Sequence, residues 1–420
     1  MTNDVYWKSG FDMGNRYLKE SFKEPEVFEE MRYSNDMLCI GKKIDGRPFY
    51  LDLREACRII IVGITRSGKT FSMRSMMDRL YATGTTMLHL NDCKNEFYSS
   101  KKPAHPKFHH HLLKNEVPRG LKVVALRPTF FKSVNPHLPK DNYWFSIDFK
   151  RMTQNDFFTL MNSEQITHNQ RIFLDIIYKS VFDFLKKNPE KSFSVELVED
   201  IIETIEDLST IQRQSLKMKF RPLKDSYFYD ADTEVDIVEL LKQGFVPALN
   251  MENFETFGRG GFLFPEVILS MVLRSIIFAK RNKELPGKLW VFMDEAPRFI
   301  ANDKKTSIKS LIQESFMLDT RYNVNYCIAT QSFNVIPEEI KENSKYIFIP
   351  NSLDLQTTRT ILMDAGLFRN VQSSTNDAIK IKNRMARFHD YSWLVLNRMT
   401  MQTDIVVFNP PLSYHVETGE

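Results

Sequence analysis

The chain has 420 residues, 42% of them apolar, with 33 Phe against only 15 Gly and a formal net charge of +4. This composition can bury a large core, so it excludes a disordered or low-complexity polymer, and the near-balanced charge excludes a domain that is basic over its whole surface. The N-terminus lacks a signal pattern and no unbroken apolar stretch reaches membrane-spanning length, so we expect a soluble, cytoplasmic protein. A disulfide framework and a zinc site are disfavoured because no C-x-x-C pair joins the four cysteines, Cys39, Cys57, Cys93 and Cys327.

Short apolar runs rich in β-branched residues recur along the chain and predict strands that are buried on both faces, as in a parallel sheet. They cover residues 59–62, 87–90, 123–126, 289–293, 326–329 and 346–349. Residues 245–250 are a weaker candidate because Pro247 cannot donate to a central ladder. Helical patterns lie between these runs; one begins after Thr306 or Ser307, with an apolar stripe at Ile308, Leu311, Ile312 and Phe316. The alternation predicts a doubly wound α/β core.

The stretch between Gly120 and Gly244 contains no glycine. From about residue 153 to residue 241 the apolar repeat is helical, with predicted stripes at Phe173, Ile176, Ile177, Val181 and Phe184 and at Val195, Val198, Ile201, Ile205 and Leu208. Sequences similar to capping boxes begin at Thr153, Ser209 and Thr233. We therefore expect an N-terminal lead-in segment (1–50), an α/β core (51–130 and 242–420) and a mainly helical insertion (131–241).

Residues 63–70, Gly-Ile-Thr-Arg-Ser-Gly-Lys-Thr, fit G-x-x-x-x-G-K-[ST] and stand between a predicted strand and a predicted helix, as this motif requires. The loop is expected to wrap the phosphates of ATP with its backbone N–H groups. Lys69 is expected to reach the β- and γ-phosphates, and the Thr70 hydroxyl to ligate Mg²⁺. The predicted nucleotide-binding residues are Gly63, Thr65, Arg66, Ser67, Gly68, Lys69 and Thr70.

Polar side chains follow two other predicted strands. Asp294 comes directly after residues 289–293 and is placed to hold Mg²⁺, with Glu295 next to it to polarise the attacking water. Gln331 follows the run at 326–329, and its amide could sense the γ-phosphate or orient the water; the alternative is a Gln that faces the loop. No [NT]-K-x-D sequence lies downstream, which argues against a guanine-specific switch.

In this order the motifs resemble those of the HerA–FtsK superfamily of P-loop motor ATPases, which also holds conjugative coupling proteins and viral genome-packaging ATPases. Residues 92–97, Asp-Cys-Lys-Asn-Glu-Phe, are similar to the family's D-p-k-G-E-[YF], and residues 329–332, Ala-Thr-Gln-Ser, to its glutamine motif. Residues 40–53 are similar to its lead-in strand and residues 405–411 to its last strand and Pro-containing tail. The chain departs at Arg66, where many relatives carry Gly. Its short N-terminal segment leaves too little room for the β-barrel of HerA helicases, which favours a plasmid or viral relative.

The resemblance implies a RecA-like P-loop ATPase core that binds ATP and Mg²⁺ and assembles as a homo-oligomeric, typically hexameric, ring with ATP between subunits. It also implies an arginine that acts in trans; Arg321 occupies the expected segment, Arg298 is a rival, and Arg321 could instead be a solvated cation near Asp319. The leading function is a helicase-type motor that translocates double-stranded DNA in DNA processing, transfer or packaging, with a nuclease, capsid or conjugation partner. The alternatives are a motor that translocates protein for secretion or conjugation, and a nucleotide-binding assembly scaffold.

Two segments are candidates for DNA contact. Residues 257–261, Phe-Gly-Arg-Gly-Gly, form a basic loop that could line a pore, and a basic run lies near the C-terminus at Lys380, Lys382, Arg384 and Arg387. Each could instead be a solvated face. The histidine-rich residues 105–111 are interpreted as a solvated loop, since no acid or cysteine accompanies them at metal-ligand spacing.

Overall fold

The computed structural model describes residues 36–92, 97–106, 109, 112, 116–129, 142–146, 149–161, 168–224, 235–250, 264–367, 371–389 and 392–414. Its strands are β1 (Met37–Lys43), β2 (Pro48–Asp52), β3 (Arg58–Val62), β4 (Thr86–Asp92), β5 (Val123–Pro128), β6 (Asn142–Phe145), β7 (Val246–Asn250), β8 (Leu289–Met293), β9 (Val324–Thr330), β10 (Tyr346–Pro350), β11 (Ser392–Asn397) and β12 (Gln402–Phe408). Its α-helices are α2 (Lys69–Ala82), α3 (Gln154–Leu160), α4 (His168–Lys187), α5 (Val195–Thr204), α6 (Thr210–Phe220), α7 (Ile237–Lys242), α9 (Phe264–Arg281), α10 (Pro297–Ile300), α11 (Ser307–Leu318), α12 (Glu338–Glu342), α13 (Leu355–Asp364) and α14 (Val371–Phe388). In this part of the chain, no helix combines the length and apolarity needed to cross a bilayer.

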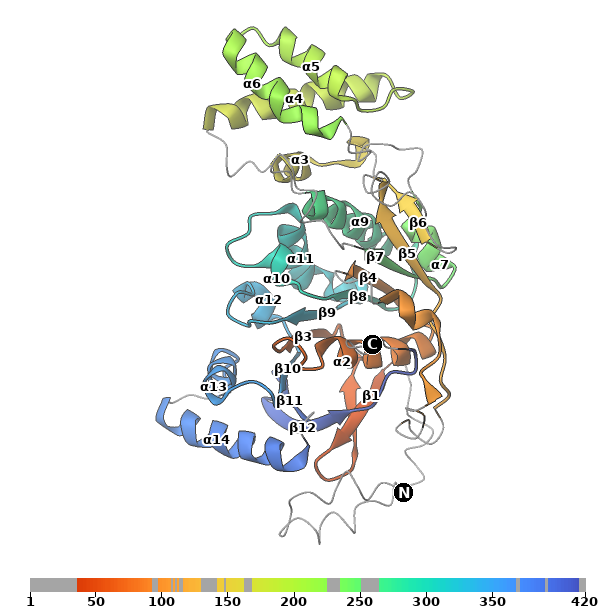
Figure 1. The fold of residues 1–420 in the computed structure, drawn as a ribbon, viewed down its shortest axis with the longest axis vertical. Coiled ribbons are helices and arrows are strands. Elements are labelled where there is room, and N and C mark those ends of the chain that lie inside the picture. Colours follow the sequence, from red (N-terminus) through yellow and green to blue (C-terminus); the bar gives the residue numbers. More distant parts are fainter. Residues whose placement is uncertain are drawn as a thin grey trace.

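One 12-stranded sheet runs through the molecule in the order β2-β1-β12-β11-β10-β3-β9-β8-β4-β7-β5-β6 (Figure 1). From β10 to β6 every neighbouring pair is parallel, whereas β11, β12, β1 and β2 extend the sheet in antiparallel pairs. We call the edge at which the parallel strands begin the amino edge, and the edge at which they end the carboxyl edge. The predicted doubly wound, mostly parallel α/β fold is confirmed.

Both faces of the sheet are covered. In β3, Ile60 and Val62 belong to the apolar cluster that includes α9 and α11, while Ile59 and Ile61 belong to the cluster that includes α2. Successive side chains of a strand point to opposite faces, so a continuous apolar run is what a strand between two helical layers requires. The predicted stripe of α11 also packs on the sheet, with Thr306 Oγ1 accepting from Lys309 N (3.3 Å).

Every predicted strand is present, including the weaker candidate at residues 245–250, which was not expected in the centre of the sheet. β7 lies inside the sheet between β4 and β5, although Pro247 lacks an N–H donor. All five of its residues are buried, and this apolar burial outweighs one missing ladder bond. The sequence patterns did not predict β6 or β11.

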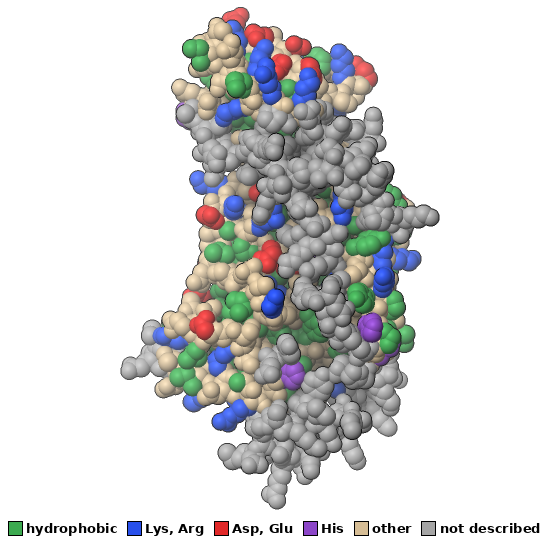
Figure 2. Space-filling view, in the orientation of Figure 1, with side chains coloured by type: hydrophobic (Ala, Val, Ile, Leu, Met, Phe, Trp, Pro, Cys, Tyr) green, Lys and Arg blue, Asp and Glu red, His purple; other side chains and the backbone are tan. Residues whose placement is uncertain are grey.

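Helices α4, α5 and α6 form a lobe at one end of the molecule, within residues 131–241 (Figure 1). Capping boxes are present at Thr153 and Ser209, whereas Thr233 lies outside the described residues and Asp236 caps α7 instead. The predicted stripe on α4 was partly wrong, because Ile176 is exposed; the buried side chains are Leu174, Ile177, Val181 and Leu185. Lys, Arg, Asp and Glu side chains are interspersed on this lobe (Figure 2).

Helix α3 connects this lobe to the sheet. The buried Asp156 forms an ion pair with Arg274 of α9 (2.7 Å), and Ser307 N donates to Thr159 Oγ1 (3.0 Å). Burial by itself raises the pKa of Asp156, but the hydrogen bond and positive charge of Arg274 lower it below its ordinary value. Asp156 is therefore paired and ionised in the folded protein.

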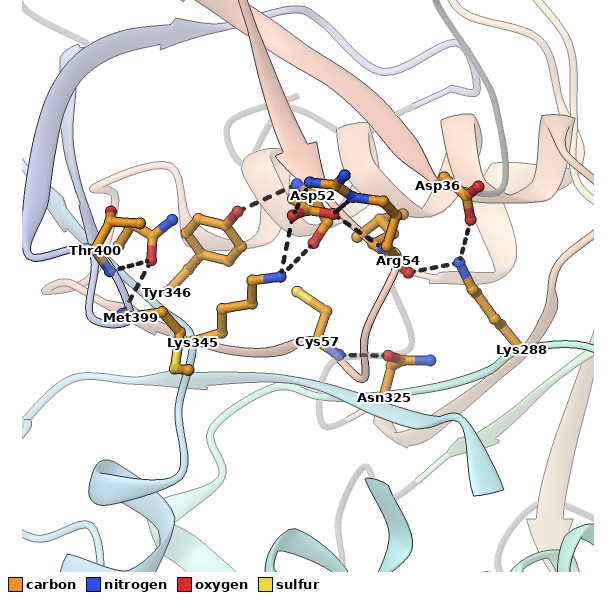
Figure 3. Close-up of polar contacts among 12 residues, drawn as sticks. Asp36, Asp52, Arg54, Cys57, Lys288, Asn325, Lys345, Tyr346, Met399 and Thr400 are labelled. Atoms are coloured by element: carbon orange, nitrogen blue, oxygen red, sulfur yellow. Dashed lines mark hydrogen bonds and ion pairs between the residues drawn. The ribbon is translucent and has the colours of Figure 1, made fainter. Parts of the chain in front are cut away.

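At the amino edge, the end of the β1–β2 hairpin is attached to the strands of the core (Figure 3). Lys288 Nζ donates to the main-chain oxygen of Leu53 (2.5 Å), and Lys345 Nζ donates to that of Asp52 (3.0 Å). Asp52 N donates to the Tyr346 hydroxyl (3.1 Å). These bonds connect the hairpin to the residues just before β8 and at the start of β10, and they join the antiparallel strands to the parallel ones.

A buried asparagine completes this edge. The side-chain oxygen of Asn325 accepts from Cys57 N (2.6 Å), and its amide nitrogen donates to the main-chain oxygens of Leu289 and Asn323 (3.1 Å each). Asn325 is only 2% exposed, so its amide satisfies main-chain groups at the starts of β3, β8 and β9 that have little access to water.

Candidate functional site

The loop of residues 63–68 joins β3 to α2 at the carboxyl edge. Lys69, the first residue of α2, is 7% exposed, and its Nζ donates to the main-chain oxygens of Gly63 (2.5 Å) and Ile64 (3.0 Å). Gly63 N donates to the main-chain oxygen of Thr330 (2.9 Å), which ties the loop to the end of β9. The ammonium group therefore lies inside the loop, where the sequence places the phosphates.

The backbone explains which residues the loop accepts. A Cβ on Gly63 would lie 2.3 Å from Ser67 Oγ, and Gly68 has φ +89°, so both positions favour glycine. Arg66, the departure from the family pattern, also adopts a left-handed conformation with φ +65°. A side chain at such a position is strained, which favours glycine there.

Asp294 follows β8 and faces the start of α2. Thr70 Oγ1 donates to Asp294 Oδ2 (3.1 Å), so the hydroxyl and the carboxylate predicted to hold Mg²⁺ are in direct contact. Glu295 N donates to Asp294 Oδ1 (2.9 Å), and Asn91 at the end of β4 donates to the Asp294 main-chain oxygen (2.7 Å). Burial and the negative charge of Glu295 raise the pKa of Asp294. A hydroxyl and a carboxylate are hard oxygen donors, which is the donor set that Mg²⁺ prefers.

Glu295 and Gln331 meet across neighbouring strands. The Gln331 side-chain amide donates to both carboxylate oxygens of Glu295 (2.9 and 3.0 Å). Strand β9 lies between β3 and β8, so Gln331 stands between the loop after β3 and the acids after β8. Glu295 itself has φ +46°, an uncommon conformation for a residue with a Cβ.

The two candidate arginines lie at different edges. Arg321 belongs to the short 3₁₀ turn Asp319–Tyr322 before β9, and its guanidinium lies over the Tyr322 ring (4.9 Å) at the amino edge. Arg298 lies in α10, just after Glu295, with its guanidinium over the Phe299 ring (5.5 Å). Arg298 is therefore close to the chain's own site, whereas Arg321 stands before β9, whose seven residues span about 20 Å.

Comparison with known proteins decides the family. Residues 38–254, more than half of the chain, match the family model described as Helicase HerA, central domain. The chain belongs to this HerA family. None of the curated proteins matches it. The solved structures that resemble it include VirB4 of Thermoanaerobacter pseudethanolicus, with a TM-score of 0.62 and 13% identity over 89% of this chain and 97% of that one.

A second similar fold is the plasmid coupling protein TrwB in complex with the non-hydrolysable ATP analogue ADPNP, with a TM-score of 0.52 and 12% identity over 95% of this chain and 92% of that one. At these identities the likeness concerns the fold, which is the RecA-like P-loop fold. This fold agrees with the family match, which makes the chain a P-loop motor ATPase of the HerA type.

Some features of this HerA-family site were not predicted, or lie outside the described residues. Asn91 was missed, although a polar residue at the end of a buried apolar strand is the signal that identified Asp294 and Gln331. Asp92 ends β4, while Glu96 of the D-x-x-x-E motif and the loop at 257–261 lie outside the described residues. In the histidine-rich segment, His109 Nε2 lies 2.9 Å from the Ala104 main-chain oxygen, and no group of acids, histidines and cysteines suited to a metal occurs in the described parts of the chain.

The basic run of this HerA-family chain lies on α14. Its buried side is formed by Ala378, Met385 and Phe388, and Lys382 is bonded to Asn351. Lys380, Arg384 and Arg387 are exposed on the other side, at positions i, i+4 and i+7, so they form one stripe along the helix. Helix α14 projects from the body at the end of the molecule opposite the helical lobe (Figure 1).

Proposed function

We propose that this protein is a Mg²⁺-dependent ATPase that translocates double-stranded DNA through a homo-oligomeric ring. The observation that carries the proposal is the double hydrogen bond from Gln331 to Glu295 beside the Thr70–Asp294 contact. These contacts place a candidate general base, Glu295, and a candidate metal site beside the P-loop. A protein that only binds nucleotide has no need of a general base.

Thr70 and Asp294 would hold Mg²⁺, with Asn91 fixing the main chain at Asp294. When bound, the metal would neutralise negative charge on the β- and γ-phosphates. Lys69 exchanges its bonds to the loop oxygens for bonds to the phosphates. The loop around it, Gly63, Thr65, Arg66, Ser67 and Gly68, would supply main-chain N–H donors to them.

Glu295 accepts a proton from the water that attacks the γ-phosphate, and Gln331 holds the carboxylate through both oxygens. Because Gln331 follows the strand between β3 and β8, a shift of its amide towards a γ-phosphate would release Glu295 to bind the water. Gln331 would thus link the presence of the γ-phosphate to the position of the base.

Arg321 would complete the site of a neighbouring subunit in the ring. It stands at the amino edge, about the length of β9 from its own Gln331. An arginine in that position can stabilise charge on a transferring phosphoryl group only in another copy of the chain.

The exposed stripe on α14 supports DNA as the translocated polymer. Cations spaced by one helical turn lie on one side of the helix, so they can contact the phosphates of a nucleic acid together. Lys380 also pairs with Asp377 one turn earlier (3.4 Å), an exposed ion pair that a phosphate group can replace. Lys380, Arg384 and Arg387 would therefore contribute to the electrostatic part of binding, which weakens as salt concentration rises.

The test is the ATPase rate of the wild type with and without double-stranded DNA at low salt, together with native mass. We expect Mg²⁺-dependent turnover that DNA stimulates and a mass of several subunits. Turnover that DNA does not change would favour a protein-translocating motor, and turnover near zero under all conditions would favour an assembly scaffold.

The role of α14 is tested by K380E/R384E/R387E, with K186E/K187E/K191E on the mixed-charge helical lobe as a control of equal charge change. We expect the α14 variant to lose most of the DNA stimulation and to keep the rate measured without DNA. Equal loss in both variants would mean that only net charge matters.

A further inference from the structure

Helix α14 carries cations on two opposite sides. Lys380, Arg384 and Arg387 form the exposed stripe, whereas Lys382 lies on the other side, because residues two apart in a helix do not face each other. Lys382 Nζ donates to the main-chain oxygen of Asn351 and to its side-chain oxygen, the latter at 3.3 Å. One helix therefore joins a stripe that faces solvent to a lysine that is bonded to the body of the protein.

Asn351 stands where two strands meet α14 at the carboxyl edge. It directly follows Pro350, the last residue of β10, and its N–H donates to the main-chain oxygen of Ser392, the first residue of β11 (2.9 Å). The Ser392 hydroxyl donates in turn to the main-chain oxygen of Met385 on α14 (3.1 Å). Asn351 is thus bonded to the helix through Lys382 and to the start of β11 through its main chain.

The residues next to Asn351 and Ser392 lie against the P-loop. Pro350 and Trp393 are partners across β10 and β11. A Cβ on Gly63 would lie 3.1 Å from Pro350 Cγ, and a Cβ on Gly68 would lie 3.7 Å from Trp393 Cζ2. Trp393 is only 3% exposed, and a close-packed interior is stiff enough to transmit small displacements. A shift of the ends of β10 and β11 therefore reaches the glycines on both sides of the loop.

We propose that Lys382 is a positioning residue that couples DNA on the α14 stripe to the P-loop through Asn351 and the Pro350–Trp393 pair. The inference rests on the proposed function, because the stripe is the DNA contact of that function. Phosphates that bind the stripe shift α14 as a rigid helix, and the bonds of Lys382 pass the shift to the end of β10. The P-loop then adopts the arrangement that holds the triphosphate more tightly.

Such a coupling must be reciprocal, and this property supplies a test without hydrolysis. If DNA raises the affinity for ATP, ATP raises the affinity for DNA by the same factor. Fluorescence anisotropy measures the affinity for a labelled DNA duplex at low salt, with and without Mg²⁺ and a non-hydrolysable ATP analogue. In the wild type we expect the analogue to tighten DNA binding by at least about 5-fold.

The variant that tests the residue is K382M, which keeps the length of the side chain and removes its hydrogen bonds to Asn351. Its affinity for DNA without the analogue should remain close to that of the wild type, because Lys382 does not face the stripe. The analogue should change that affinity by less than about 2-fold. A full wild-type effect of the analogue in K382M would overturn the proposal.

Two further variants are the controls. K380M removes the same charge from the stripe, so it should bind DNA more weakly in both conditions and keep the effect of the analogue. S392A removes another hydrogen bond that holds α14 and leaves Lys382 in place, so it should also keep the effect. Loss of the effect in S392A as complete as in K382M would overturn the specific role of Lys382.

Thermal unfolding separates coupling from simple anchoring. A lysine that only anchors α14 would lower the unfolding midpoint in K382M and leave the effect of the analogue unchanged, which would overturn the proposal. Failure of the proposed function would look different: a wild type that does not bind DNA at low salt would overturn both. A wild type that binds DNA equally well with and without the analogue would overturn the coupling alone.

Discussion

The two edges of the parallel sheet use polar groups in opposite ways. At the amino edge, Asn325, Lys288 and Lys345 bond to main-chain atoms, and their bonds hold neighbouring strands together. At the carboxyl edge, Glu295 and Gln331 bond mainly to each other, and both remain reachable from solvent. Loops leave the sheet at the carboxyl ends of the strands and turn apart, so side chains there are free to meet a ligand. The comparison predicts that substitutions of Glu295 and Gln331 change activity, whereas substitutions of the amino-edge side chains that bond to main-chain atoms change stability.

The largest effect is expected for Glu295→Gln. Removal of a general base lowers turnover by about 10²–10⁴-fold, which corresponds to about 3–5 kcal/mol in the barrier. The midpoint of thermal unfolding should stay the same, because the amide of Gln331 can still donate to the substituted side chain. Steady-state ATPase assays and calorimetry check this.

Nucleotide binding is the control for E295Q, and we expect it to be unchanged because the variant leaves Lys69 and the P-loop intact. Retained hydrolysis in E295Q would remove Glu295 from the mechanism.

Asn325→Ala should give the converse result at the amino edge. The Cys57 N–H loses its partner, and the oxygens of Leu289 and Asn323 each lose a bond, in a site that is almost inaccessible to water. The expected loss is about 2–4 kcal/mol in the free energy of unfolding. Urea denaturation measures it, while the ATPase rate per folded molecule should stay within twofold of the wild type. A large fall in rate with full stability would contradict the division between the edges.

Asp52→Asn, at the amino edge, should change how the free energy of unfolding of the protein depends on pH. The hydrogen bond from Arg54 holds the pKa of Asp52 well below its ordinary value of 3.8. The native state therefore binds this proton less readily than the unfolded state does. The stabilisation is present above pH 3.8 and is lost as pH falls below it.

Because the pair is partly exposed, this effect is small. Unfolding free energies at pH 7 and pH 3 should differ less in D52N than in the wild type, and identical pH dependence would show that the pair contributes nothing.

The smallest effect is expected for Arg66→Gly at the carboxyl edge. Glycine relieves the strain of the left-handed backbone at this position, but it also raises the conformational entropy of the unfolded chain. The net result should be a free energy of unfolding that is higher by about 0.5–1 kcal/mol. Thr65→Gly is the control, since Thr65 is not among the residues with positive φ and should only lose stability. A gain in both variants would mean that backbone strain at Arg66 is not the cause.

Much of this could be predicted from local sequence. Each apolar run between helical patterns had to be a buried strand, and the P-loop, Asp294 and Gln331 are recognisable because each polar group ends such a run. The central position of β7 in the sheet and the buried face of α4 could not be predicted from local sequence. Pro247 can lie in an interior strand because the neighbouring residues of β7 are buried in the sheet. Ile176 is exposed because the buried face of α4 depends on which helices pack against it, and the sequence period alone does not specify that face.

The sequence by itself determined the fold class, the family and the chemistry available at the carboxyl edge, because these depend on short-range patterns of residue type. Only the tertiary structure decided that Gln331 bonds to Glu295 and that Asn91 supports Asp294. Each of these pairs joins segments that are distant along the chain. Their contact depends on strand order and helix packing, which no local pattern specifies.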